Sequence, residues 1–279
     1  MSELDKSLCD KDTKASEIIS NFLDNTLYDT LVKTGKIRKY ERVFEKKRQF
    51  EGVDVIFYLN NGHELAIDEK CAVQYINCNL HTFAMELSTR TKDKSHFLQL
   101  GWFLNDELST DYYILVWPCT FDGNTRDKNE IDALRTDELT CIDVALVSKD
   151  AIRTNLYNKG YSKDVLMKID NYFRENDMRK KRTEYPDYAF YYCEKAKTSS
   201  GEDYMSEEPM SILIPKKEIM ELATRTGAFW NIGQEYIILG EILDGTQKYK
   251  FLKGNDDIFS HETEILRTHK PFVNYPLFA

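Results

Sequence analysis

The alternation of apolar and polar positions along the chain predicts both helices and strands. Apolar residues recur three and four positions apart over residues 15–32, which is typical of a helix with one buried face. Elsewhere, short runs rich in β-branched and aromatic residues are typical of strands. The predicted strands cover residues 40–44, 52–59, 64–72, 82–89, 111–120 and 140–147. The predicted helices cover residues 15–32, 95–104, 149–158 and 162–176. Such interleaving predicts an α/β or α+β fold rather than a helical bundle.

The chain after residue 178 follows a different pattern. Residues 179–209 are mainly polar and charged, which predicts a long excursion away from the preceding core. Residues 211–214 then predict a short strand, and a helix follows with Pro215 in its first turn. Residues 236–243 and 247–252, separated by an Asp-Gly-Thr turn, predict a hairpin.

Length and composition are consistent with one large core and an addition to it. The chain has 279 residues, of which 42% are hydrophobic and 13% aromatic, and this excludes wholesale disorder. No apolar run approaches the roughly 18–20 residues that span a bilayer, so we expect no membrane association. The predicted organisation is a disordered tail (1–14), a core (15–178), a charged excursion (179–209) and a C-terminal α+β extension packed on the core (210–279).

Cysteines, histidines and short motifs exclude several classes of protein. The six cysteines are scattered without a CxxC pair, which is typical of a reducing cytoplasm, so we expect a cytoplasmic location. The five histidines form no HxH or HExxH spacing, which argues against zinc. The chain also lacks a GxSxG elbow, a Walker A loop and a GxGxxG fingerprint.

Charge is distributed unevenly along the chain. The formal net charge of −9 argues mildly against a nucleic-acid ligand. Residues 31–50, however, contain eight Lys and Arg against two Glu, a local net of 8 − 2 = +6. A basic run is usually a solvated face, but this one directly precedes an acidic hairpin. We take as candidate nucleic-acid contacts Lys36, Arg38, Lys39, Arg42, Gln49 and Gln74.

The segment from Gly52 to Lys70 predicts a β-hairpin whose register depends on its turn. A two-residue turn at Asn61-Gly62 would set Asp54 opposite Glu69. That register would place Asp68 among apolar side chains, and burying its charge there would be costly.

A three-residue loop at residues 60–62 avoids that cost. Gly62 supplies the left-handed residue of a G1 bulge, and Asp54 then lies directly across from Asp68. Two opposed carboxylates repel each other unless a cation lies between them. One face of this hairpin collects the apolar residues Val53, Val55, Phe57, Leu65 and Ile67. The other face collects Asp54, Asp68 and Lys70, with Ile56, Tyr58 and Ala66.

The charged residues of the hairpin also resemble a known signature. Val53-Asp54, followed after thirteen residues by Asp68-Glu69-Lys70, resembles the motif of the PD-(D/E)xK nuclease superfamily. The resemblance covers about residues 40–120. It implies a restriction-endonuclease-like mixed β-sheet core flanked by helices. It also implies hydrolysis of phosphodiester bonds with Mg²⁺ or Mn²⁺ as the cofactor.

The resemblance assigns roles to these residues. Asp54 and Asp68 would hold the metal, with the Glu69 carbonyl as a further oxygen ligand. Lys70 would orient the attacking water or stabilise charge on the scissile phosphate.

The sequence departs from the family's pattern in three ways. Val53 replaces the motif's proline, and Asp68 stands where Glu is more usual. Residues 73–81 leave little room for the helix that normally lies between the third and fourth core strands. The predicted helix at residues 95–104 is the candidate replacement.

Two further acids are weaker candidates. Glu86 alternates with Phe83, Met85 and Leu87 in a predicted strand, so it either faces the same site as a catalytic group or is a solvated strand residue. Glu45 is the candidate extra acid from an upstream element, and Glu41 competes with it.

The sequence therefore predicts a Mg²⁺-dependent nuclease acting on nucleic acid, DNA in preference to RNA. The alternatives are a catalytically inactive nucleic-acid-binding protein of the same fold and an acidic protein-interaction factor. The sequence leaves homodimer formation open.

Overall fold

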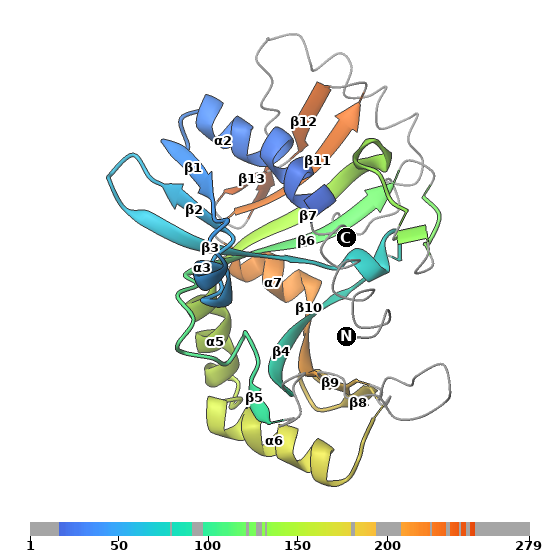
Figure 1. The fold of residues 1–279 in the computed structure, drawn as a ribbon. Helices are drawn as coiled ribbons and strands as arrows, with labels where there is room; N and C mark the ends of the chain where they lie inside the picture. Colours follow the sequence, from blue (N-terminus) through green and yellow to red (C-terminus); the bar gives the residue numbers. More distant parts are fainter. Residues whose placement is uncertain are drawn as a thin grey trace.

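A computed structural model gives the structure of most of the chain (Figure 1). It describes residues 17–78, 80–90, 97–120, 123–126, 130–131, 133–179, 182–193, 208–223, 225–232, 235–239, 241–243 and 246–248. The fold is mixed α/β, with two main sheets whose strand pairs are mostly antiparallel, so the predicted fold class is confirmed at this level. The predicted tail at residues 1–14 lies outside the described residues.

The larger sheet has seven strands. Its order is β1 (Lys39–Arg42), β2 (Val55–Tyr58), β3 (Glu64–Cys71), β6 (Tyr112–Thr120), β7 (Leu139–Ser148), β11 (Arg225–Ile232) and β12 (Glu235–Leu239). β3 and β6 are parallel, whereas the other neighbouring strands are antiparallel. A parallel pair requires a crossover connection, and here the chain passes through the second sheet between β3 and β6.

The second sheet has five strands, all paired antiparallel. Its order is β5 (Leu98–Leu100), β4 (Thr82–Arg90), β10 (Met210–Pro215), β9 (Ala189–Tyr192) and β8 (Arg182–Glu184). A separate pair, β13 (Glu241–Leu243) and β14 (Thr246–Lys248), confirms only part of the predicted hairpin, because residues 236–239 of its first strand belong to β12 and pair with β11.

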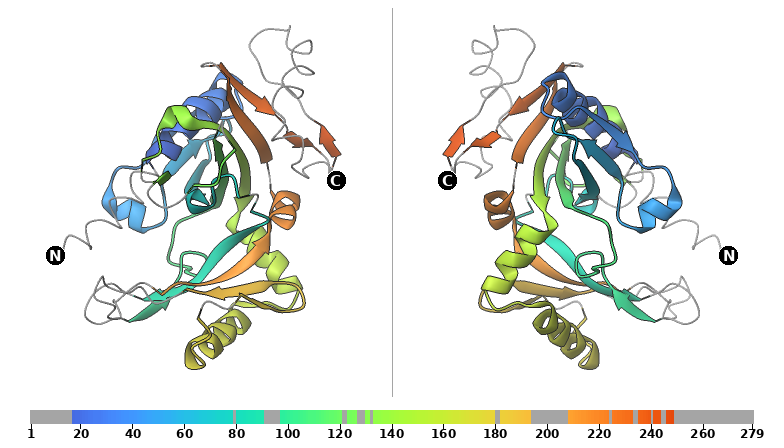
Figure 2. Two further views of the ribbon diagram at one scale, coloured as in Figure 1. Left: turned by 90° about the vertical axis from the view of Figure 1, so that its right-hand side faces the viewer. Right: turned by 90° about the vertical axis from the view of Figure 1, so that its left-hand side faces the viewer.

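Helices cover the sheets on several sides. Residues 17–33 are helical, with a π-helical turn η1 (Asp24–Tyr28) leading into α2 (Asp29–Lys33), and this helix lies on one face of the larger sheet (Figure 1). α6 (Lys163–Glu175) lies beneath the five-stranded sheet in the side views of Figure 2. The remaining helical segments are α3 (Lys46–Phe50), η2 (Val73–Tyr75), η3 (Thr136–Glu138), α5 (Lys149–Asn158) and α7 (Lys216–Leu222).

Hydrophobic clusters occupy the two faces of the larger sheet, as the alternation of side chains along each strand requires. The first cluster joins the N-terminal helix to residues such as Val55, Ile67 and Val116. The second joins the opposite face, including Leu115, to strands of the five-stranded sheet through residues such as Met85. The second face of the larger sheet is therefore directed toward the five-stranded sheet.

The predicted helix at residues 95–104 is wrong for the part that the structure describes. Leu98–Leu100 form strand β5, which pairs with β4, and a turn follows. Gly101 shows why this segment is not helical: a Cβ placed there would lie 2.6 Å from the backbone oxygen of Glu86. The close approach to β4 needs a residue without a side chain, and glycine is also a poor helix former.

The region after residue 178 contributes to both sheets. β8 and β9 lie within the segment predicted as a charged excursion, so this segment is not wholly irregular. β10 lies between β4 and β9, and β11 pairs with β7. The predicted core and C-terminal extension thus share sheets.

Candidate functional site

The hairpin formed by β2 and β3 has the predicted register. Val55 pairs with Ile67 and Phe57 pairs with Leu65. The backbone nitrogen of Leu59 donates to the carbonyl of His63 at 2.8 Å, which closes a three-residue loop. Gly62 has a φ of +87°, the left-handed conformation that the bulge requires. The three-residue loop is confirmed. The strand pairing ends at Val55 with Ile67, and the backbone nitrogen of Asp54 donates to the Ile67 carbonyl at 2.8 Å, which holds Asp54 beside β3.

Val53 does not lie where we expected. It packs with Val43 and Ile56 in a small cluster on the opposite face from Val55. The reason is that β2 begins only at Val55, so the strict alternation of the strand does not extend back to Val53.

Asp54 and Asp68 lie together on the face of the hairpin directed toward the five-stranded sheet. The Asp54 carboxylate accepts a hydrogen bond from the backbone nitrogen of Glu69 at 2.8 Å, which fixes its position beside β3. The Asp68 side chain is almost fully buried, with 1% of the residue exposed. Lys70 Nζ donates to Asp68 Oδ1 at 2.5 Å. The structure therefore brings all three predicted residues into one cluster.

The electrostatics of this cluster are unusual. The pKa of Asp68 is raised to about 7, mainly because the carboxyl is buried; Lys70 lowers this pKa, and the neighbouring Asp54 adds to the rise. Burial alone would lower the pKa of Lys70, but the charges of Asp68 and Asp54 outweigh it and the net shift is upward. Lys70 is therefore cationic at neutral pH, whereas the Asp68 carboxyl titrates close to neutral pH.

One oxygen of the cluster identifies what it could bind. Asp68 Oδ2 is buried and has no hydrogen-bond partner in the protein. A buried, unsatisfied carboxylate oxygen is costly unless a donor or cation reaches it. Two neighbouring carboxylates fit Mg²⁺, which is commonly held by one or two carboxylates and keeps several waters. Within the described ranges, no group of three or more His, Cys, Asp or Glu side chains is arranged to hold a metal, so a metal here would have two carboxylate ligands from side chains.

Glu69 and Arg42 have structural partners beneath the hairpin. The Glu69 carboxylate points to the opposite face from Asp68, where it accepts hydrogen bonds from Ser20 at 2.9 Å, from Tyr28 and from Arg42 at 3.0 Å. Of Glu69, only the backbone carbonyl could meet the predicted metal. Arg42 also pairs with Asp24 at 2.6 Å. Its guanidinium is held by these two carboxylates, which gives Arg42 a structural role, and the predicted contact of Arg42 with nucleic acid stays a prediction.

Glu86 acts electrostatically on Lys70, while the choice between a site residue and a solvated strand residue stays a prediction. Phe83, Met85 and Leu87 are buried, and Glu86 lies on the other face of β4 with partial exposure. Its charge contributes to the raised pKa of Lys70. The five-stranded sheet thus supplies an acidic side chain to a site otherwise built on the larger sheet.

The remaining predicted residues are spread over the surface. Lys36, Arg38 and Lys39 are exposed, and Lys39 forms an ion pair with Glu41. Glu45 is exposed immediately before α3. The ion pair that Lys39 forms with Glu41 lies on this exposed surface and not at the hairpin carboxylates.

The two glutamines differ in their surroundings. Gln49 is exposed, and its side-chain amide donates to the Val43 carbonyl at 2.9 Å. Gln74 is exposed in η2 and lines a cavity that Lys70 also lines. Of the two, Gln74 is the one that the structure places beside the cluster.

The short helix α3 carries residues that the sequence did not single out. Phe44 and Phe50 flank its exposed basic residues Lys47 and Arg48, and are themselves 83% and 82% exposed. The Arg48 carbonyl accepts a hydrogen bond from the backbone nitrogen of Val53 at 3.1 Å, so α3 is tied to the chain beside Asp54. The sequence signal for this surface is the presence of Phe44 and Phe50, two large apolar residues, within a run of basic residues.

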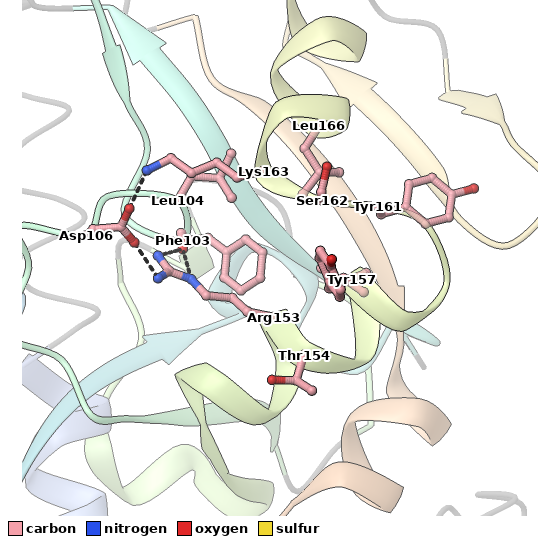
Figure 3. A pocket seen from close by; sticks show the side chains of 11 residues that line it. Phe103, Leu104, Asp106, Arg153, Thr154, Tyr157, Tyr161, Ser162, Lys163 and Leu166 are labelled. Carbon is pink, nitrogen blue, oxygen red and sulfur yellow. Dashed lines mark hydrogen bonds and ion pairs between the residues drawn. The ribbon is translucent and has the colours of Figure 1, made fainter.

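A second cavity lies between α5 and α6 (Figure 3). It has a volume of about 290 Å³. Arg153 and Lys163 both reach into this region, and both bind Asp106. Because the two cations share this carboxylate and Arg153 also donates to the Phe103 carbonyl at 3.0 Å, the ion pairs connect the helices to the preceding loop.

Comparisons of the chain with protein-family profiles, curated proteins and solved structures found no match. In the part of the chain that the structure describes, no helix has the length and apolarity needed to cross a membrane. The case for a function therefore rests on the geometry of the hairpin cluster.

Proposed function

We propose that this protein is a divalent-metal-dependent nuclease that hydrolyses phosphodiester bonds in nucleic acid, with DNA as the preferred substrate. The observation that supports it best is the pair Asp54 and Asp68, with one buried oxygen of Asp68 unsatisfied and Lys70 beside it. This arrangement is costly for stability, and such arrangements cluster at functional sites.

Each residue has a role that its position supports. Asp54 and Asp68 would hold Mg²⁺ or Mn²⁺, and a bound metal would lower the pKa of a water molecule and neutralise charge on the phosphate. Lys70, kept cationic by its acidic neighbours, orients the attacking water or binds a phosphate oxygen. The charge of Glu86, on the five-stranded sheet, would help to keep Lys70 cationic.

The fold and the surface beside the site support the same proposal. The parallel pair β3 and β6, next to the antiparallel β2–β3 hairpin, is compatible with a restriction-endonuclease-like mixed sheet. α3, with exposed Lys47 and Arg48, offers cations to the phosphate backbone close to Asp54. This positive surface would allow a chain whose overall charge is −9 to bind nucleic acid.

A panel of substrates tests the proposal. Plasmid, linear duplex and single-stranded DNA and RNA are incubated with purified protein in Mg²⁺, Mn²⁺ or EDTA. We expect cleavage of at least one substrate with either metal and none with EDTA. Asp68→Ala should abolish the cleavage and Lys70→Ala should slow it strongly, while Glu64→Gln, an exposed change on the same strand, should leave it unchanged. Equal cleavage by all four proteins would refute the site.

A nucleic-acid-binding protein without activity is the second candidate. The observation in its favour is that Lys70 already neutralises Asp68 at 2.5 Å, so the pair could be purely structural. This candidate predicts salt-sensitive binding and no metal-stimulated cleavage on any substrate.

A further inference from the structure

A cavity of about 330 Å³ lies beside Lys70, between the η2 segment and β4. Its volume is at the lower end of the range of small-molecule sites, about 300–1,000 Å³. Its walls are mostly aromatic or apolar, with few polar groups. The residues that carry the argument are Lys70, Gln74, Tyr75, Phe83, Ala84 and Trp102.

This cavity is continuous with the proposed active site. Lys70 belongs to both, because its ammonium binds Asp68 while its side chain lines the cavity. The same ammonium lies 5.2 Å from the centre of the Trp102 ring. Ala84 lines the cavity, and Glu86 lies two positions later on the same face of β4. This face of β4 therefore borders both the cavity and the region of Glu86.

The chemistry of the walls favours a flat, heteroaromatic ligand. Trp102 and Phe83 supply aromatic surface within the cavity, and Tyr75, 51% exposed, adds a further ring to its lining. Gln74 adds an exposed amide, which can both donate to and accept from the polar edge of a ring. Aromatic rings together with an amide are the means by which proteins bind unstacked nucleobases.

We propose that this cavity is a nucleobase pocket that receives one unstacked base of the strand being cut, next to the scissile phosphate. The inference rests on the proposed nuclease function and specifies its substrate class. Lys70 would lie near the phosphate while the attached base enters between Tyr75 and Trp102. The enzyme would then prefer single-stranded or locally unpaired nucleic acid, since a paired base must first leave its stack at a cost of a few kcal/mol.

Binding of a fluorescent base tests the pocket independently of cleavage. Single-stranded and duplex oligonucleotides that carry one 2-aminopurine are titrated with the protein in EDTA, and anisotropy and 2-aminopurine emission are both recorded. We expect tighter binding of the single strand and a change in emission on binding. Tyr75→Ala should weaken single-strand binding about 10-fold, within the range for loss of one stacked base. Gln74→Ala should alter the preference among bases.

Matched variants keep the test interpretable. Tyr172→Ala removes a tyrosine of similar exposure, 52%, on α6, and should leave binding unchanged. Trp102 packs on Tyr113, so Trp102→Phe is used to keep the fold while reducing the stacking surface, and it should weaken binding.

The alternative outcomes are distinct. Binding of adenosine monophosphate that depends on Tyr75, without any effect of Tyr75→Ala on oligonucleotides, would overturn the inference in favour of a site for free nucleotides. Equal oligonucleotide binding by wild type and Tyr75→Ala would also overturn it. Metal-dependent cleavage that requires Asp68 but ignores Tyr75 would leave the proposed nuclease intact and refute only the pocket. Only the absence of cleavage that depends on Asp68 would refute the proposed nuclease function.

Discussion

At the scale of single residues, the site depends on Asp68, a buried carboxylate with a raised pKa. Its carboxylate is buried, one oxygen is bound by Lys70, and the other has no protein partner. A carboxylic acid in such a place binds a proton more readily than in water, and a divalent cation can replace that proton. Metal binding and proton binding at Asp68 should therefore compete.

This competition predicts a stability change with pH in EDTA. The folded pKa of about 7 exceeds the ordinary value of 3.8, so between these values the folded protein keeps a proton that the unfolded chain has lost. The resulting stabilisation is present at low pH and is lost as the pH rises through about 7. From about pH 5 to pH 8, the free energy of unfolding of wild type should fall by about 3 kcal/mol relative to that of Asp68→Asn. The fall is about 1.4 kcal/mol per pH unit up to about pH 7 and levels off above it.

Urea unfolding of the two proteins at both pH values measures this difference. Asparagine has nearly the same shape and does not titrate, so it is the matched control. A free-energy difference that stays constant between the two pH values would show that Asp68 has an ordinary pKa in the folded protein.

We expect substitutions of Arg42 and Arg48 to affect different properties, stability in one case and nucleic-acid binding in the other. Arg42 is held by Asp24 and Glu69 with little exposure, so Arg42→Ala should lower the free energy of unfolding by about 3 kcal/mol. Arg48 is exposed on α3, so Arg48→Ala should leave stability unchanged and weaken nucleic-acid binding. Thermal unfolding and binding titrations on both variants distinguish the roles. Equal loss of affinity without loss of stability in Arg42→Ala would contradict the assignment.

At the scale of elements, the β2–β3 hairpin determines whether the site forms. Its register depends on a loop whose third residue is left-handed, and Gly62 adopts this conformation at no steric cost. A Cβ at Gly62 would meet no atom within 4 Å, so a substitution there acts only through backbone strain.

Gly62→Ala should therefore destabilise the protein by about 1 kcal/mol and reduce cleavage, because strain in the loop favours other registers. Gly62→Asn should cost less, since asparagine tolerates the left-handed region. Unfolding free energies and cleavage rates of the two variants give the comparison. Wild-type stability and activity in Gly62→Ala would mean that the loop does not set the register.

The elements that the sequence predicted well are those with local signals. The hairpin could be derived because its turn glycine and its alternating side chains are close in sequence. The helices α5 and α6 begin after Ser148 and Ser162, whose side chains accept hydrogen bonds from the first turn, and such caps are readable in a sequence. Strand β5 could not be predicted, because it forms by pairing with β4 and by the close approach of Gly101 to Glu86.

At the scale of the whole molecule, the site lies where the two sheets face each other. The larger sheet supplies Asp54, Asp68 and Lys70, whereas the five-stranded sheet supplies Glu86 and part of the cavity beside Lys70. Contacts between elements far apart in sequence, such as Arg42 with Glu69 or Lys70 with Trp102, leave no periodic pattern in the chain. The hairpin cluster was therefore predictable, whereas the ion pairs beneath it and the aromatic cavity were not.

The charge distribution of the molecule leads to a prediction about salt. Binding should be driven by local positive surface despite the net charge of −9, so affinity should fall steeply with salt. Replacing both Lys47 and Arg48 with Ala should reduce the slope of log K against log salt by about 2, if each contacts one phosphate. Binding isotherms over a range of salt concentrations measure the slope. An unchanged slope would exclude α3 from the interface.

The most direct test of the central claim is the rate of Mg²⁺-dependent cleavage under single-turnover conditions in three proteins. Wild type and Glu64→Gln should cleave at the same rate, whereas Lys70→Ala should be slower by about 10²–10³, the usual cost of removing one group that stabilises transition-state charge. EDTA should stop the reaction, and Mg²⁺ should restore it. Cleavage that persists in EDTA, or a Lys70→Ala rate equal to wild type, would contradict the assignment of this hairpin as the nuclease site.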